Sequence, residues 1–140
     1  MFTLTVVGAE TFTIPQECIT SAEFITEIPK DSDARTGDVG ITLIVEGKIL
    51  AAKAGDPIEN TRQLALWAMM PSEKADGYRG VLLESVRGNV VLREYHLPNA
   101  FATDFKEDFR DKEGVGTFTV KLKQKKDRIE SVTVNGGYLK

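Results

Sequence analysis

One long stretch, residues 90–123, limits the folds open to this chain more than any other part of it. From Phe118 to Leu122, apolar residues alternate with polar ones, and alternation with a period of two is typical of a strand with one buried face. The stretch begins with the apolar run Val90-Val91-Leu92 and includes an acidic, aromatic segment at 104–111. We therefore predict two long β-rich segments joined by a charged bend.

Shorter β-rich segments account for most of the remaining chain, at residues 2–7, 11–14, 17–28, 39–50, 78–86, 89–97 and 129–134. The first two are separated by Gly8-Ala9-Glu10 and predict an opening hairpin, and Arg87-Gly88-Asn89 predicts another turn. Gly47 predicts a bulge in its strand. The polar segment 29–38 predicts an exposed loop, which is either a simple connector or an arm that reaches a neighbouring subunit.

A single segment carries clear helix signals. Asp56 can cap free backbone N–H groups, Pro57 suits the first helical position, and Glu59 stands where a capping-box acid reaches back. Apolar residues then recur at helical spacing: Leu64, Trp67 and Ala68. Because Pro71 ends the pattern, we predict one helix over residues 57–70, packed on a sheet.

Length and composition fit a single domain that covers residues 1–140. A chain of 140 residues can bury a core without disulfide or metal support. A hydrophobic content of 41% with 28% charged residues argues against disorder. About eight or nine strands and one helix predict a mainly β fold. We expect an antiparallel β-barrel, or a tightly closed sandwich, with one flanking α-helix around residues 57–70.

The start of the sequence does not match a targeting segment. Residues 1–12 have neither a basic region nor a long apolar core, as a secretory signal peptide would. No apolar run approaches the roughly 20 residues of a membrane-spanning helix. Cys18 is the only cysteine, which suits a reducing compartment. We expect a cytoplasmic protein, or one that is exported by a route without a classical leader.

The reactive side chains do not indicate an enzyme. His96 is the only histidine and Cys18 the only thiol, and they lie far apart in the sequence. These two residues cannot build a usual zinc site, and the acidic residues of 104–113 are interleaved with basic ones, without the spacing of a calcium loop. Trp67 and Met70 could line a cofactor pocket, but at helical spacing we interpret them as core. We expect no catalytic, metal or cofactor site.

A basic run near the C-terminus is the one feature that suggests an anionic partner. Lys121, Lys123 and Lys125 point to one face of the predicted strand. The net charge of −3 and the lack of interleaved aromatic residues weigh against nucleic acid, and lysines often protect a sheet edge. The alternative function is a small monomeric or dimeric β-barrel binding module that uses this Lys-rich strand for an anionic ligand or nucleic acid.

Three stretches carry a resemblance to a known family. They are Asp31-Ser32-Asp33-Ala34-Arg35-Thr36-Gly37-Asp38-Val39-Gly40, Leu97-Pro98-Asn99-Ala100-Phe101-Ala102-Thr103-Asp104-Phe105-Lys106-Glu107-Asp108-Phe109 and Thr117-Phe118-Thr119-Val120-Lys121. In order and character they resemble the tube proteins of type VI secretion systems, the haemolysin-coregulated protein family, especially its divergent, phage tail-tube-like branches. The resemblance covers residues 20–125. The short chain, the Lys-rich strand and the Gly-Gly-Tyr end depart from the larger members.

The resemblance implies a structural protein rather than an enzyme. It implies a β-barrel that forms hexameric rings, which stack into the tube of a contractile injection or secretion machine or a phage-like tail. The implied partners are copies of the chain itself and the sheath, spike or effector proteins of that machine, which would also export it; neither a membrane nor nucleic acid is expected. The loop at residues 30–38 would reach a neighbouring subunit. Candidate interface residues lie in that loop and in the acidic, aromatic segment: Asp31, Asp33, Arg35, Asp38, Phe105, Asp108 and Phe109.

Overall fold

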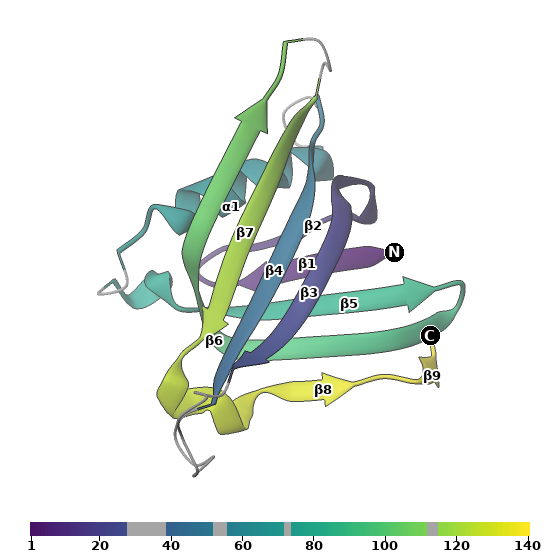
Figure 1. The fold of residues 1–140 in the computed structure, drawn as a ribbon, viewed down its shortest axis with the longest axis vertical. Coiled ribbons are helices and arrows are strands. Elements are labelled where there is room, and N and C mark those ends of the chain that lie inside the picture. The colour runs from purple at the N-terminus through teal and green to yellow at the C-terminus, as the bar shows by residue number, and fades with distance from the viewer. Residues whose placement is uncertain (28–38, 52–55, 72–73, 112–114) are drawn as a thin grey trace.

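The computed structural model describes residues 1–27, 39–51, 56–71, 74–111 and 115–140, and within them one antiparallel sheet of nine strands dominates (Figure 1). The strand order is β2-β1-β5-β6-β7-β4-β3, with the short strands β8 and β9 also paired to β6. The strands are β1 (Phe2–Val7), β2 (Thr11–Ile14), β3 (Ile19–Glu27), β4 (Gly40–Ile49), β5 (Arg79–Arg87), β6 (Val90–Phe109), β7 (Gly116–Gln124), β8 (Thr133–Asn135) and β9 (Tyr138–Leu139).

Strand β6 is 20 residues long and belongs to two halves of the sheet. Residues 90–97 lie in the β5 half, with β1, β2, β5, β8 and β9, and residues 100–109 lie in the β7 half, with β3, β4 and β7. The strands of the two halves cross in Figure 1. The register with β5 skips at Pro98 and Asn99, where proline cannot donate a ladder hydrogen bond. The long strand therefore changes direction at this bulge.

The predicted charged bend at residues 104–111 is wrong for most of its length. Residues 104–109 pair with β7 residue by residue, from Asp104 opposite Lys121 to Phe109 opposite Gly116. The alternation of Asp104, Phe105 and Lys106 gives this segment one face towards solvent and one towards the protein interior. Asp104, Lys106 and Asp108 thus lie on the outer face of a strand, whereas Glu107 shares the inner face with Phe105 and Phe109.

The core lies between the two halves of the sheet. Its largest fully buried side chains come from both halves and from the helix: Trp67, Phe118, Leu4, Ile14, Leu43, Leu64, Leu83, Leu97 and Leu122. The predicted mainly β fold with one flanking helix is confirmed. Among the described residues the sheet is not closed, because its path begins at β2 and ends at β3 without a hydrogen-bonded pair between them.

The helix covers the interior face of the sheet near its predicted position. A 3₁₀ turn, η2 (Pro57–Asn60), leads into α1 (Thr61–Ala68), and the Asp56 side chain accepts a hydrogen bond from the Ile58 N–H at 3.1 Å. Trp67 is 2% exposed and donates its indole N–H to the Gly77 carbonyl oxygen, so its assignment to the core is confirmed. Met70 is half-buried and belongs neither to the core cluster nor to the residues packed against it, so its assignment to the core is wrong. No described helix is long and apolar enough to cross a membrane.

Other local predictions hold or fail for physical reasons that the structure shows. Both predicted hairpins form, and the second turns at Gly88 with φ +63°. The bulge expected at Gly47 lies on the partner strand instead, where Thr20 is the extra residue between the Ile19 and Ser21 pairs. The strand predicted at 129–134 is mostly a 3₁₀ helix, η4 (Lys126–Ser131), and the pairing begins only at Thr133. The remaining short helices are η1 (Gln16–Cys18) and η3 (Ala75–Gly77).

Candidate self-association surfaces

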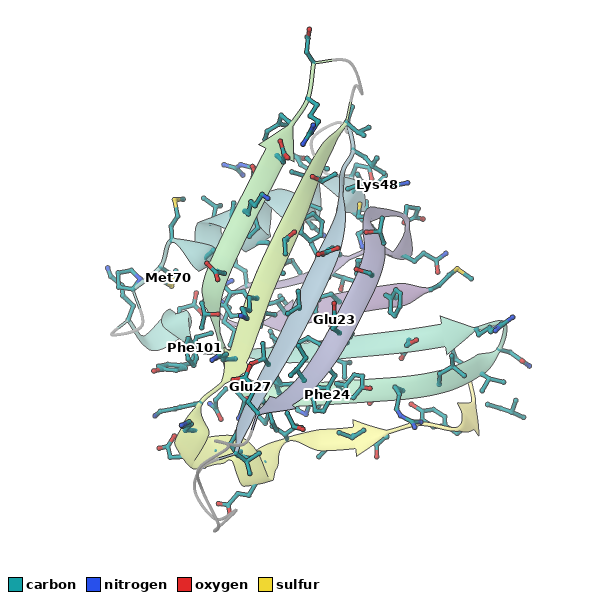
Figure 2. All side chains as sticks on the ribbon, in the orientation of Figure 1. Glu23, Phe24, Glu27, Lys48, Met70 and Phe101 are labelled. Atoms are coloured by element: carbon teal, nitrogen blue, oxygen red, sulfur yellow. The ribbon has the colours of Figure 1, made fainter. Side chains whose placement is uncertain are left out.

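The outer face of the β7 half is a charged surface. Its side chains alternate along each strand with the buried ones. The acidic residues of this face are Glu23, Glu27, Glu46, Asp104 and Asp108, and the basic residues are Lys48, Lys106, Lys121 and Lys123. Figure 2 labels Glu23 and Glu27 along β3, and Phe101 near the opposite side of this half. The face carries both signs of charge in close alternation.

The lysines of β7 point outward as predicted, but acidic groups surround them. In the sheet register, Lys121 on β7 pairs with Asp104 on β6. On its other side it pairs with Ile44 on β4, and Ile44 in turn pairs with Glu23 on β3. Lys123 lies 3.9 Å from the Glu27 carboxylate. Lys125 leaves the strand and places its ammonium group 5.3 Å from the ring centre of Tyr78. The β7 lysines therefore form part of a mixed surface and do not make a continuous cationic stripe.

Two long sheet edges lie open on the same half. Among the described residues only β4 pairs with β3, which runs for 9 residues along one side of the β7 half. On the other side, the pairing of β6 with β5 stops at Ala100 opposite Arg79, so residues 101–109 pair with β7 alone. An open edge presents backbone N–H and C=O groups that can pair with another chain.

The edges of the β5 half are covered instead. The Asn60 amide donates to the Thr13 carbonyl oxygen at 2.9 Å, so η2 lies against β2. Residues 90–96 of β6 pair with β8 and β9 on the side away from β5. Among the described residues, the longest strand edges without a backbone partner therefore belong to the β7 half.

The predicted interface residues are placed in different environments. Phe105 is half-buried and packs against the core, whereas Phe109 is 65% exposed at the end of β6. Asp108 faces outward, and its carboxylate lies 3.5 Å from the Arg110 guanidinium. The four residues predicted from the loop lie outside the described residues: Asp31, Asp33, Arg35 and Asp38. The assignment of all seven to a subunit interface remains a prediction.

Sequence reasoning missed the open edge of β6, because it read residues 104–111 as a bend. A signal was present in the alternation of Asp104, Lys106 and Asp108 with Phe105 and Phe109. Acidic and basic side chains at every second position are compatible with a strand whose outer face meets solvent.

The two reactive side chains do not come together. Cys18 is fully buried within the core, and burial, with a smaller effect of the neighbouring Glu17 carboxylate, raises the pKa of its thiol. His96 is exposed on the outer face of the β5 half, between Leu82 and Thr133. In the described part of the chain, no three histidine, cysteine, aspartate or glutamate side chains gather as metal ligands would.

Comparisons with known proteins show likeness only through structure. No protein-family profile and no curated protein matches the sequence. A chain from the sheath-tube complex of an extracellular contractile injection system, PVC, in its extended state is 14% identical, with a TM-score of 0.57 over 97% of this chain and 88% of that one. A chain from a PVC sheath/tube terminator is also 14% identical, with a TM-score of 0.56 over 96% and 93%.

The fold is also similar to that of a type VI tube protein. Hcp1 from Flavobacterium johnsoniae is 13% identical, with a TM-score of 0.53 over 98% of both chains. The resemblance inferred from the sequence is thus confirmed for the fold, and it extends over nearly the whole chain. The protein shares its fold with these three chains.

Proposed function

We propose that this protein is a structural subunit that associates with copies of itself into hexameric rings, and that the rings stack into a tube. The tube would belong to a contractile injection or secretion machine or to a phage-tail-like particle. Its fold supports this proposal, because the solved structures that share it include chains of sheath-tube assemblies. The subunit number of six comes from the sequence resemblance to the tube family.

The observation that carries the proposal is the pair of open edges on the β7 half. Its four strands, β6, β7, β4 and β3, are successively antiparallel. Because the number of strands is even, β3 runs antiparallel to β6. When copies are arranged head to tail, β3 of one copy can therefore form an antiparallel pair with β6 of the next. A contact between two different edges repeats head to tail, and it closes into a ring when the rotation per copy fits.

The loop at residues 30–38 gives the proposed ring a second kind of contact. In the sequence it stands between β3 and β4, and its charged residues include Asp31, Asp33, Arg35 and Asp38. In the proposed assembly it reaches a neighbouring subunit or ring. Sheath, spike or effector proteins of the same machine are the further proposed partners, and the subunit is cytoplasmic until its machine exports it.

A test of the edge contact needs a substitution that spares the β3–β4 ladder. The Thr20 hydroxyl donates to the Glu46 carbonyl oxygen at 3.1 Å, which turns that carbonyl towards β3. Since Ser21 is the partner of Glu46, alternation along β3 points the Thr26 N–H away from β4. Thr26→Pro removes this outward backbone N–H. Thr26→Val keeps the backbone N–H and has a side chain of similar shape.

The proposal predicts that the wild-type protein and Thr26→Val form ring-sized particles in light scattering and negative-stain images, whereas Thr26→Pro does not. Circular dichroism would show that Thr26→Pro is folded. Equal assembly of all three proteins would exclude the β3 edge from the contact. Shortening the loop at residues 30–38 should weaken stacking and leave single rings, and unchanged tube length would contradict the role of that loop.

A further inference from the structure

The last eight residues form a strap along the edge of the β5 half. This C-terminal strap, residues 133–140, contains β8 and β9, and Figure 1 shows β8 running beside the first part of β6. The Gly137 N–H donates to the Val91 carbonyl oxygen at 2.8 Å, and the Lys140 N–H donates to the Asn89 carbonyl oxygen at 2.7 Å. All eight of its residues are exposed. The strap therefore adds little to the core and mainly covers an edge.

Beside the strap, on β6, stands a buried apolar residue that the main core does not include. Val91 is only 1% exposed, yet it is separate from the core cluster. In the register it stands between Val86 of β5 and Tyr138 of β9. Without the strap, this edge of β6 would present free backbone groups, and Val91 would lose Tyr138 as its neighbour in the sheet. Free backbone groups beside an apolar side chain favour pairing with another chain.

Two side-chain contacts hold the strap, and each is made to one member of a pair of glutamates. Glu84 and Glu94 lie directly opposite each other on β5 and β6, where like charges are unfavourable. Tyr138 donates its hydroxyl to Glu94 at 2.7 Å, and the Lys140 ammonium lies 2.9 Å from Glu84. The hydrogen bond to the Glu94 carboxylate raises the pKa of Tyr138. The strap thus supplies a donor to one carboxylate and a positive charge to the other.

The strap can follow this path only because of two glycines. Gly137 has φ +77°, a conformation that favours glycine. A Cβ at Gly136 would overlap the Leu92 carbonyl, with the carbonyl carbon only 2.9 Å away. A side chain at residue 136 would therefore push the strap off its edge without touching the core.

We propose that the C-terminal strap is an edge guard, which keeps residues 90–96 of β6 from pairing with the same edge of a second copy. With the strap displaced, two such edges can pair antiparallel about a two-fold axis and give a closed dimer. This contact uses a different edge from the proposed ring. The strap would thereby restrict association to the β7 half.

The register offers a reversible lock for the test. Because the Lys140 N–H bonds to the Asn89 carbonyl, Val90 and Leu139 form a non-hydrogen-bonded pair. The Cα atoms of such pairs lie about 4.5 Å apart, within the range of a disulfide. A Val90→Cys/Leu139→Cys disulfide would hold the strap in place, and the native Cys18 thiol is buried.

The experiment measures molar mass by light scattering, with all proteins in the Thr26→Pro background so that ring formation does not mask the result. Gly136→Val and Tyr138→Ala each displace the strap, and Val134→Thr, at an exposed strap residue, is the matched control. We expect a twofold mass for the two displaced variants and a single-chain mass for the control. Circular dichroism would check that each variant is folded.

The disulfide then distinguishes displacement of the strap from a general destabilisation of the protein. In Tyr138→Ala carrying Val90→Cys and Leu139→Cys, oxidation should return the protein to single-chain mass and reduction should restore the dimer. A single-chain mass for both folded displaced variants would overturn the proposal. So would a dimer that persists after oxidation, because the strap would then be in place. Neither result bears on whether the unmodified protein forms rings through its other edges.

Discussion

The rings of Phe24 and Tyr95 stack with their centroids 4.3 Å apart and their planes inclined by 12°. Phe24 lies on β3, at one end of the strand order, and Tyr95 lies in the part of β6 that pairs with β5. The stack therefore joins the two halves of the sheet at a point where no backbone pairing closes them. Side-chain packing takes the place of a hydrogen-bonded barrel seam.

Phe24→Ala should destabilise the protein by about 2 kcal/mol, because it removes a half-buried aromatic side chain and leaves a cavity. Thermal unfolding of Phe24→Ala, Tyr95→Ala and the double variant would isolate the stacking term, which for such pairs is about 0.5–1.5 kcal/mol. Strictly additive effects would show that the two rings do not stabilise each other, and the joint between the halves would then lie elsewhere.

Gly47 on β4 is required by its neighbours rather than by its backbone conformation. A Cβ there would overlap the Cys18 carbonyl oxygen and approach the Phe118 ring to 2.6 Å. Gly47→Ala should therefore cost about 1–3 kcal/mol of unfolding free energy. Gly40→Ala in the same strand is the control, since its nearest foreign atom would lie 3.8 Å away. Equal denaturant midpoints for the two variants would contradict this account of Gly47.

The Asp76 carboxylate connects the first hairpin to the start of β5. It accepts the Ala9 N–H at 3.0 Å and the Arg79 guanidinium at 2.6 Å, and Arg79 also lies over the Trp67 ring. The Ala9 hydrogen bond, with a smaller contribution from Arg79, holds the pKa of Asp76 below its ordinary value of 3.8. Asp76→Asn should lower the unfolding free energy at pH 7 by about 1–2 kcal/mol, allowing for partial exposure.

The same contact predicts a pH dependence. A carboxyl whose pKa is lower in the folded state stabilises the fold above its unfolded pKa, and this stability is lost as pH falls through the folded pKa. The difference in melting temperature between wild type and Asp76→Asn should therefore shrink below about pH 4. A difference that stays constant from pH 7 to pH 2.5 would show that charge on Asp76 is not what stabilises the contact.

The mixed charge of the β7 outer face predicts that it does not hold nucleic acid. Acidic groups next to Lys121 and Lys123 should repel a phosphate backbone, so fluorescence anisotropy with a labelled oligonucleotide should show no binding at physiological salt. Detectable, salt-dependent binding that weakens in Lys121→Ala or Lys123→Ala would favour the alternative of a small binding module.

Local patterns in the sequence predicted most of the elements, and the failures share a cause. The capping residues before α1, the glycine turn at Gly88 and the alternation in β7 act over a few residues, so they could be read directly. The continuation of β6 through Asp104–Phe109 depends on β7 as a partner, which no local pattern reveals. Likewise the strap depends on Leu92 and Val91, more than 40 positions away from its glycines.

For the candidate surfaces, the sequence predicted which side chains of β7 point outward, but it did not predict which sheet edges are unpaired. It placed Lys121 and Lys123 correctly on the outer face, because strand alternation decides this. It did not foresee that Lys125 leaves the strand or that Phe105 packs against the core. The open edge of β3 could not be predicted, since it depends on which strands are neighbours in the sheet. Strand order depends on contacts between residues far apart in the chain.

The central claim is tested most directly by the molar mass of the purified protein, measured by size-exclusion chromatography with light scattering across a range of concentrations. The account predicts a species of six chains, about 92 kDa from the chain mass of 15.4 kDa, with ring-shaped particles in negative-stain images. A single-chain mass at every concentration, with no rings in the images, would contradict it.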